Sequence, residues 1–364
     1  MSSFEFDDIG PLKTLELYFP RSGFKAIVVI DNVSLGPSIG GVRVSRDLTI
    51  EEVKRLARTM TMKNSVAGLP HGGGKAGIVA DPTSAEKEKY FRLFARAIKD
   101  MDEYIPGPDM GSNEECMAWI YDEIKRAVGL PEEIGGLPLD KLGATGFGLS
   151  ECAEVACLYA GISLRGAKVA IQGFGSVGKA TARFLSEKGA VLVAVSDTKG
   201  TIYNLDGIDV GELITVKEET GSVINYKRGS VMSCDDLFTT PCEILIPAAT
   251  PDVINKENVN RLRARLIIQG ANIPVTIEAE RILHEKGIIS VPDFIANAGG
   301  VIMAAMEYAR KSEKEAFSAI SERIKKNTGL ILEKTFKEKI LPRQAAEEIA
   351  RERVLRAMRY RGDI

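Results

Sequence analysis

The stretch KVAIQGFGSVGKATARFLSEKGAVLVAVSD, residues 168–197, constrains the fold more than any other part of the chain. It contains an apolar strand, a turn with the spacing G-x-G-x-x-G, an amphipathic helix and a second apolar strand that ends at Asp197. Elements in this order predict one βαβ unit of a parallel, doubly wound sheet.

Each glycine of this turn has a separate task if the unit binds a dinucleotide. Gly173 permits the tight turn, Gly175 lets the backbone approach the pyrophosphate, and Gly178 allows close packing of helix on strand. The first helical residues, Ser176 and Val177, offer N–H groups and the positive end of the helix dipole to the phosphates. The alternative is a structural glycine turn in some other α/β fold.

Asp197 lies nineteen residues after Gly178, where a carboxylate can accept hydrogen bonds from the adenosine ribose hydroxyls. A carboxylate there repels a 2′-phosphate, so Asp197 favours NAD as the cofactor. Lys199 follows two residues later and softens that repulsion, which leaves NADP open.

Further elements complete an α/β pattern around this unit. Residues 24–30 are typical of a buried strand, and Thr49 with Glu52 three residues later forms a capping box that starts a helix. The face of this helix predicted to be buried holds Val53, Leu56, Ala57 and Met60. Other strands are predicted at 243–249, 266–271 and 287–292, and helices at 86–101, 116–128, 151–160 and in the charged tail 312–364.

Composition excludes several classes of partner. The chain has 364 residues with 48 basic and 50 acidic ones, a balance that supports neither nucleic acid nor a membrane surface as partner. Five cysteines without C-x-x-C spacing, and an acidic start without an apolar segment, predict a cytoplasmic protein without disulfides. No apolar run of about 18 residues is present to span a membrane. With two histidines, a His-based metal site is not expected, and we predict no metal.

The segment MTMKNSVAGLPHGGGKAG, residues 60–77, places Lys63 and Lys75 in a glycine-rich, apolar setting without a carboxylate. Burial lowers the pKa of a lysine because it destabilises the ammonium, and a second ammonium lowers it further. One lysine can then act as a base near pH 7–8 while the other pairs with a substrate carboxylate. The alternatives are an exposed loop lysine and a phosphate loop, but Ala76 stands where the latter needs Ser or Thr.

Asp109 lies in PGPDMGSN, between prolines, glycines and a predicted helix start. It can supply the proton that chemistry at a nitrogen atom requires. A turn residue or a helix N-cap is the alternative interpretation.

Nine segments together resemble the glutamate/leucine/phenylalanine/valine dehydrogenase family, and they cover most of the chain in the family's order. They are GPSIGGVRV (36–44), MTMKNSVAGLPHGGGKAGIVADP (60–82), YIPGPDMGSN (104–113), GATGFGL (143–149), QGFGSVGK (172–179), SDTKGTIYN (196–204), ILIPAA (244–249), QGANIPVT (269–276) and IANAGGV (295–301). The resemblance implies reversible, NAD- or NADP-dependent oxidative deamination of an L-amino acid to a 2-oxo acid and ammonium.

The resemblance also implies roles for individual residues. Lys63 resembles the lysine that binds the substrate α-carboxylate, Lys75 the low-pKa lysine that activates water, and Asp109 the acid that carries protons to and from the amine. Both ammonium groups would then gain partners only when substrate binds. Asn297 resembles a residue of the substrate cleft; the residues expected at the nicotinamide cofactor are Thr145, Ala248 and Asn272.

Two positions bear on the substrate side chain. Glutamate-specific members usually carry a lysine where this chain has Ile39, and a serine where it has Ala304. Burying a distal carboxylate against them would cost several kcal/mol, so an apolar amino acid is favoured. Glutamate remains the alternative, with Ile39 and Ala304 as core residues and Arg43 as the partner of the distal carboxylate. A non-catalytic NAD-sensing relative of the family and an ATPase are the competing functions from different classes.

The predicted fold class is α/β, with two domains and a cleft between them. Residues 1–145 are expected to form a smaller α/β domain for substrate binding and oligomerisation, and residues 146–330 a Rossmann-like dinucleotide-binding domain. The family resemblance implies that the helices of residues 331–364 return to the first domain. It also implies a homo-oligomer, hexameric or octameric.

Overall fold

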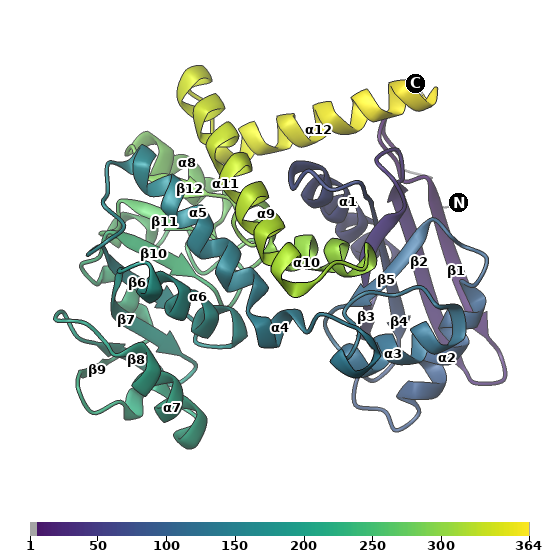
Figure 1. Ribbon diagram of the computed structural model, residues 1–364, viewed down its shortest axis with the longest axis horizontal. Coiled ribbons are helices and arrows are strands. Elements are labelled where there is room, and N and C mark those ends of the chain that lie inside the picture. Colours follow the sequence, from purple (N-terminus) through teal and green to yellow (C-terminus); the bar gives the residue numbers. More distant parts are fainter. Residues whose placement is uncertain (1–5, 364) are drawn as a thin grey trace. The chain divides into compact units, whose positions relative to one another are not determined.

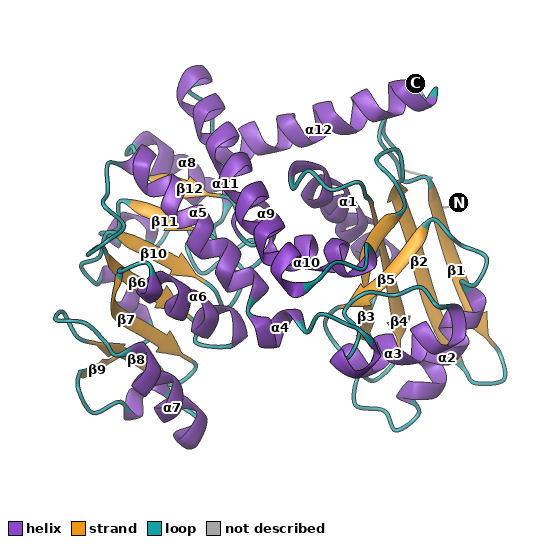
Figure 2. Ribbon diagram, in the orientation of Figure 1, coloured by secondary structure: helices purple, strands orange, loops and turns teal. Residues whose placement is uncertain are grey.

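Residues 6–363, which the computed structural model describes, divide between two sheets, each with its own helices (Figures 1 and 2). The first unit holds the chain up to Leu139, Val301–Ala316 and the segment from Glu347 onward. The second unit holds Asp140–Gly300 and Phe317–Ala346. The predicted α/β fold with two separate sheets is therefore confirmed.

The sheet of the first unit has five strands in the order β1-β2-β4-β3-β5. The first two strands form an antiparallel hairpin, β2 is antiparallel to β4, and β3 lies parallel to both β4 and β5. Their bounds are β1 Lys13–Phe19, β2 Phe24–Asn32, β3 Ser38–Ser45, β4 Gly72–Val79 and β5 Tyr104–Pro108.

Helices cover both faces of this sheet. One apolar cluster joins Ile27 and Val29 of β2 to Val53 and Ala57 of α1 (Ile50–Val66). The alternate residues of β2 point to the opposite face of the sheet and pack against α2 (Lys87–Ala97) and α3 (Glu114–Ile124). Because both faces are covered, β2 is buried from Ala26 to Asn32, as predicted for residues 24–30.

The start of α1 is the predicted capping box, since the Thr49 side chain accepts a hydrogen bond from the Glu52 N–H. Its predicted buried face is only half right, because Leu56 and Met60 are partly exposed. Beyond Ala57 the buried residues of α1, apart from Val66 at its end, are polar: Thr61, Asn64 and Ser65.

These polar side chains are buried because backbone and carboxylate partners meet them. The Thr61 hydroxyl donates to Asp31 Oδ2 at 2.5 Å, and Asn64 Nδ2 donates to the Gly72 carbonyl at 2.6 Å. Partners so distant in sequence cannot be seen in an apolar periodicity, so the pattern alone misplaced this part of the face.

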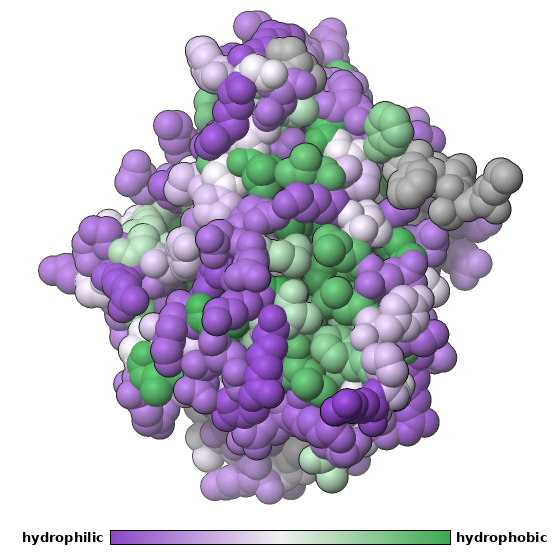
Figure 3. Space-filling model, turned by 90° about the vertical axis from the view of Figure 1, so that its right-hand side faces the viewer, coloured by the Kyte–Doolittle hydropathy of each residue, from purple (hydrophilic) through white to green (hydrophobic). Residues whose placement is uncertain are grey.

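β1 lies at the edge of the first sheet, so among residues 6–363 one side of its backbone has no strand beside it. Large apolar side chains at or next to β1, Leu12 and Tyr18, are exposed. Apolar side chains also gather on the face of the molecule shown in Figure 3, which is the side where β1 and β2 lie in Figure 1.

The sheet of the second unit has seven strands in the order β12-β11-β10-β6-β7-β8-β9. The run from β12 to β7 is parallel, as predicted, whereas β8 and β9 are added antiparallel. The bounds are β6 Lys168–Gln172, β7 Val191–Asp197, β8 Gly200–Tyr203, β9 Ser230–Met232, β10 Ile244–Pro247, β11 Leu266–Ile268 and β12 Ile289–Val291.

The remaining helices are α4 Leu139–Leu142, α5 Ala144–Ala160, α6 Ser176–Glu187, α7 Val210–Thr220, α8 Ile277–Glu285, α9 Asp293–Ala296, α10 Gly299–Tyr308, α11 Glu313–Glu338 and α12 Pro342–Arg361. Within residues 6–363, none of the helices is long and apolar enough to cross a bilayer. In the same part of the chain, no group of three or more His, Cys, Asp or Glu side chains could hold a metal ion.

Candidate active site

Lys75 lies in the middle of β4, on the face of the first sheet that α1 covers. The segment GGGKAGIV is therefore a strand and not a phosphate loop. In the parallel register Arg43 of β3 pairs with Gly77 of β4, which places Gly41 beside Lys75. A Cβ atom on Gly41 would lie 3.2 Å from Lys75 Nζ and 2.7 Å from Asp109 Cβ, so only glycine fits beneath these two side chains.

Asp109 directly follows β5 and pairs with Lys75. The distance from Lys75 Nζ to Asp109 Oδ2 is 2.9 Å, and Lys75 is only 6% exposed. Lys75 thus has a partner within the chain itself, contrary to the expectation that it gains one only from substrate. The alternative of an exposed loop lysine is wrong.

Burial lowers the pKa of Lys75, since the ammonium loses its hydration; Asp109 opposes this shift and Arg43 adds to it. For Asp109, burial raises the pKa, but Lys75 and Arg43 outweigh burial and hold the pKa of this carboxyl below its usual value. The pair is therefore a carboxylate beside an amine that releases its proton more readily than a free lysine does.

Arg43 was the alternative partner predicted for a distal substrate carboxylate. In the structure its Nε donates to Asp109 Oδ2 at 3.0 Å and its Nη1 donates to Glu52 Oε1 at 2.7 Å. Its guanidinium thus joins the end of β5 to the first turn of α1.

The other substrate-site residues predicted in the first unit are Lys63, Ile39 and Ala304. Lys63 lies in the last turn of α1 and is partly exposed. Ile39 of β3 and Ala304 of α10 are buried, with 3% and 7% of their surfaces exposed. Both of these predicted apolar side chains are therefore shielded from solvent.

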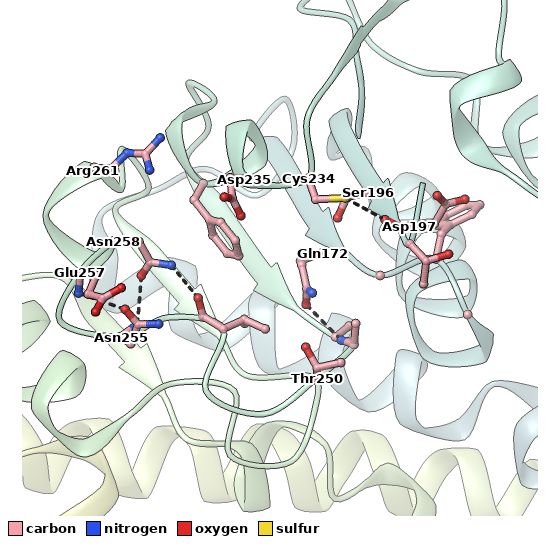
Figure 4. Close-up of a pocket in the computed structure, with 18 of the residues that line it drawn as sticks. Gln172, Ser196, Asp197, Cys234, Asp235, Thr250, Asn255, Glu257, Asn258 and Arg261 are labelled. Atoms are coloured by element: carbon pink, nitrogen blue, oxygen red, sulfur yellow. Dashed lines mark hydrogen bonds between the residues drawn. The ribbon is translucent and has the colours of Figure 1, made fainter. Parts of the chain in front are cut away.

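A cavity of about 820 Å³ opens at the carboxyl ends of β6, β7 and β10 in the second unit (Figure 4). The predicted residues Gly173, Gly175, Asp197 and Ala248 line it. Ligands of doubly wound sheets bind at this edge of the strands, and the cavity is large enough for much of a dinucleotide.

The glycine turn beside this cavity has the predicted geometry. Gly173 has a φ of +93°, which side chains rarely adopt. A Cβ on Gly178 would lie 1.9 Å from the Gly173 carbonyl oxygen, whereas nothing lies within 4 Å of a Cβ built on Gly175. Ser176 and Val177 form the first turn of α6, whose N–H groups are not used by the helix itself. These features fit a dinucleotide pyrophosphate.

Asp197 does not have the free carboxylate that the sequence predicted. Its Oδ2 accepts hydrogen bonds from Lys217 Nζ at 2.7 Å and the Val223 N–H at 2.8 Å. Its Oδ1 accepts them from the Lys199 N–H at 2.8 Å and the Ser222 hydroxyl at 3.2 Å. Four donors fill the four lone-pair positions, so no position is left for ribose hydroxyls. These hydrogen bonds therefore give no support to the inference from Asp197 to NAD.

Asn297, Asn272 and Thr145 lie outside the cavity lining. Asn297 Nδ2 donates to Asn272 Oδ1 at 3.2 Å, so the structure brings these two predicted residues together. Thr145 stands in the first turn of α5. A Cβ on Gly299 would lie 3.1 Å from Thr145 Cα, so this helix start meets the turn that follows Asn297.

Two family models match the chain and cover most of it. Residues 135–362 match the Glutamate/Leucine/Phenylalanine/Valine dehydrogenase model, and residues 11–126 match the Glu/Leu/Phe/Val dehydrogenase dimerisation domain. The chain belongs to the glutamate/leucine/phenylalanine/valine dehydrogenase family. It is thus an amino acid dehydrogenase that uses NAD or NADP, as the resemblance predicted.

Relatives of this dehydrogenase include proteins of both cofactor types. It is 40% identical over 356 residues to an NADP-specific glutamate dehydrogenase of Saccharolobus shibatae, covering 91% of this chain and 84% of that protein. It is 36% identical over 375 residues to an NAD-specific glutamate dehydrogenase of Staphylococcus aureus, covering 98% and 88%.

A solved structure shares the fold of the dehydrogenase. The leucine-bound hetero-hexameric glutamate dehydrogenase of Thermus thermophilus superimposes with a TM-score of 0.85 at 28% identity. The match covers 96% of this chain and 90% of that one.

Sequence reasoning missed several groups that the dehydrogenase places at these sites. Gly41 and Glu52 were not singled out beside Lys75, and Lys217 was not singled out at the cavity. Positions 39, 41 and 43 alternate along one strand and so share a face, which is a signal that could have revealed Gly41 and Arg43. No local signal points from Asp197 to Lys217, because helix α7 brings it there from 20 residues away.

Proposed function

We propose that the dehydrogenase catalyses reversible oxidative deamination of L-glutamate to its 2-oxo acid and ammonium. The observation that carries this proposal is the buried Lys75–Asp109 pair, because it combines a base and a proton carrier in one hydrogen-bonded unit. Relatives named glutamate dehydrogenase, similar over most of their length, support glutamate better than an apolar substrate.

Lys63 binds the substrate α-carboxylate, and Asp109 accepts a proton from the substrate ammonium. Gly173 and Gly175 line the cavity that would hold NAD or NADP, and the bound cofactor would supply the acceptor for the hydride of the substrate Cα. Neutral Lys75 then removes a proton from the water that attacks the resulting imine. Once Lys75 has passed that proton to solvent, it takes the hydroxyl proton of the carbinolamine while Asp109 returns its proton to the amine. The C=O bond forms, the C–N bond breaks and ammonia departs.

Lys63, Lys75 and Asp109 have different roles in the reaction because their surroundings differ. Lys63 is partly exposed and carries the charge that pairs with a carboxylate. The lowered pKa of Lys75 makes it a base at a pH where an exposed lysine is protonated. Asp109 alternates between both protonation states during one turnover.

An apolar amino acid is the second candidate substrate. Buried Ile39 and Ala304 favour it, since neither can pair with a distal carboxylate. Leaving a carboxylate without a partner in such surroundings costs several kcal/mol.

The test is a panel of L-glutamate, L-leucine, L-valine and L-phenylalanine, each with NAD and NADP, followed by absorbance of the reduced nicotinamide. We expect the highest kcat/KM with glutamate. Lys75→Met should abolish the reaction, whereas Lys89→Met, which removes an exposed lysine, should keep it. A higher kcat/KM with leucine would replace glutamate by the second candidate, and no reaction with any amino acid would refute the proposal.

We further propose that the enzyme uses both NAD and NADP as cofactors. Lys217 pairs with Asp197 and lines the same cavity, so the charge of this carboxylate is offset where it would otherwise repel a 2′-phosphate. The wild-type kcat/KM values for NAD and NADP should lie within about tenfold of each other, or ~1.4 kcal/mol. Lys217→Gln uncovers the charge of Asp197 and should shift the preference toward NAD. A wild-type enzyme that prefers NAD by roughly a hundredfold would contradict this.

We also propose that the chain forms a homo-oligomer of six or eight subunits. The match of residues 11–126 to a dimerisation domain supports this, as does the exposed edge strand β1. Light scattering coupled to gel filtration gives the subunit number, and a monomer at micromolar concentration would exclude the proposal.

A further inference from the structure

Arg43 connects three elements of the first unit. It extends from β3 on the same face as Gly41, and 18% of its side chain is exposed. Its Nε donates a hydrogen bond to Asp109, which directly follows β5, and its Nη1 donates one to Glu52 in the first turn of α1. An arginine fork that is fixed at both ends has little freedom, so it holds the carboxylate of Asp109 in one orientation.

The two cations next to Asp109 share a single oxygen. Lys75 Nζ lies 2.9 Å and Arg43 Nε 3.0 Å from Oδ2. No side chain or backbone group among residues 6–363 donates to Oδ1. A carboxylate held in this way keeps one oxygen available for a new hydrogen bond.

We propose that Arg43 is a positioning residue of the catalytic centre: together with Lys75 it holds Oδ2 of Asp109, so that Oδ1 exchanges protons with the substrate amine. This inference rests on the proposed function, because it explains how Asp109, the proton carrier of that function, is oriented. Arg43 acts through Asp109 and has no step of its own in the reaction.

The charged groups around Lys75 and Asp109 make the positioning role of Arg43 measurable in the pH dependence of the reaction. Arg43 lowers the pKa of both Asp109 and Lys75, while Glu52 raises the pKa of Lys75. Tyr104 of β5 also interacts electrostatically with Asp109, but burial holds the pKa of Tyr104 well above the usual value and its hydroxyl donates to the Gly40 carbonyl. Tyr104 therefore stays neutral.

Activity requires neutral Lys75 and ionised Asp109, so the acid limb of the kcat/KM profile falls as these groups take up protons. Removing Arg43 raises the pKa of both, which moves this limb to higher pH. Removing the charge of Glu52 lowers the pKa of Lys75, which moves the limb to lower pH. A merely structural role for Arg43 predicts no opposite movement.

The experiment measures kcat/KM against pH for the wild-type enzyme and for Arg43→Met, Arg43→Lys and Glu52→Gln. We expect Arg43→Met to lower kcat by roughly 10- to 100-fold, because Asp109 loses its orientation. Its acid limb should move to higher pH and that of Glu52→Gln to lower pH. Arg43→Lys keeps the charge but loses the fork, so its limb should stay in place while kcat falls.

Arg46→Met is the matched control, since it removes an exposed arginine–aspartate pair just beyond the same strand and should change neither quantity. If the acid limbs of the kcat/KM profiles of Arg43→Met and Glu52→Gln stay at the wild-type pH, or both move in the same direction, the inference is overturned. Should Arg43→Met not fold, Arg43→Lys and Glu52→Gln decide alone. A wild-type enzyme inactive toward amino acids refutes the proposed function instead, so the two failures are distinguishable.

Discussion

Replacing Gly41 by alanine tests whether the close approach of β3 to the Lys75–Asp109 pair is needed for activity. A Cβ atom at this position would lie 2.7 Å from Asp109 Cβ and 2.8 Å from the Pro108 carbonyl oxygen. An ordinary contact of a Cβ atom begins at 3.4 Å, so Asp109 must move by 3.4 minus 2.7, or 0.7 Å.

This displacement is large enough to break the pair. Adding 0.7 Å to the 2.9 Å between Lys75 Nζ and Asp109 Oδ2 gives up to 3.6 Å, beyond the length of a hydrogen bond. A misplacement of about 1 Å costs a catalytic group roughly 100-fold in rate. Overpacking also costs about 1–3 kcal/mol, which lowers the Tm of a unit of this size by roughly 3–10 °C.

Steady-state kinetics and thermal unfolding check both magnitudes. Gly41→Ala should lose roughly 100-fold in kcat, whereas the Kd for the dinucleotide, whose cavity is built by the second unit, should not change. Gly107→Ala is the matched control on β5, because its Cβ would meet only Val128, at 3.2 Å from a side-chain carbon. The reasoning is refuted if Gly41→Ala keeps wild-type kcat while its Tm falls.

Three further changes have defined outcomes. Asp109→Asn removes the carboxylate partner of buried Lys75 and should lower the free energy of unfolding by about 3–5 kcal/mol in urea titrations at neutral pH, with loss of activity. Gly178→Ala puts a Cβ 1.9 Å from the Gly173 carbonyl oxygen, so calorimetry should show loss of dinucleotide binding. Arg343→Met leaves two buried carboxylates of the second unit without their cation and should cost about 3–5 kcal/mol, measured as Tm; an unchanged Tm would contradict this.

Much of the second unit could be read from the sequence because its signals are local. The apolar strand, the glycine turn and the following helix lie within residues 168–197, and the steric need for Gly178 comes from Gly173 in the same turn. The additional antiparallel strands β8 and β9 were not predicted, since strands of three or four residues carry little periodic signal.

Residue types alone indicated that Lys75 and Asp109 have unusual surroundings, because glycine and apolar neighbours exclude water from a lysine. Their partners could not be predicted in the same way. Arg43 and Lys75 lie on β3 and β4, Asp109 directly follows β5, and only the parallel register of these three strands brings the three side chains together.

The sequence by itself determined the family and the glycine turn of the second unit, because short-range sterics and residue chemistry fix these. Tertiary structure alone decided which charges meet. It gave Lys75 a carboxylate before any substrate binds, and it surrounded Asp197 with four donors that leave nothing for a ribose. The physical reason is that hydrogen bonds and ion pairs depend on distances of about 3 Å between atoms, and the folded chain sets those distances.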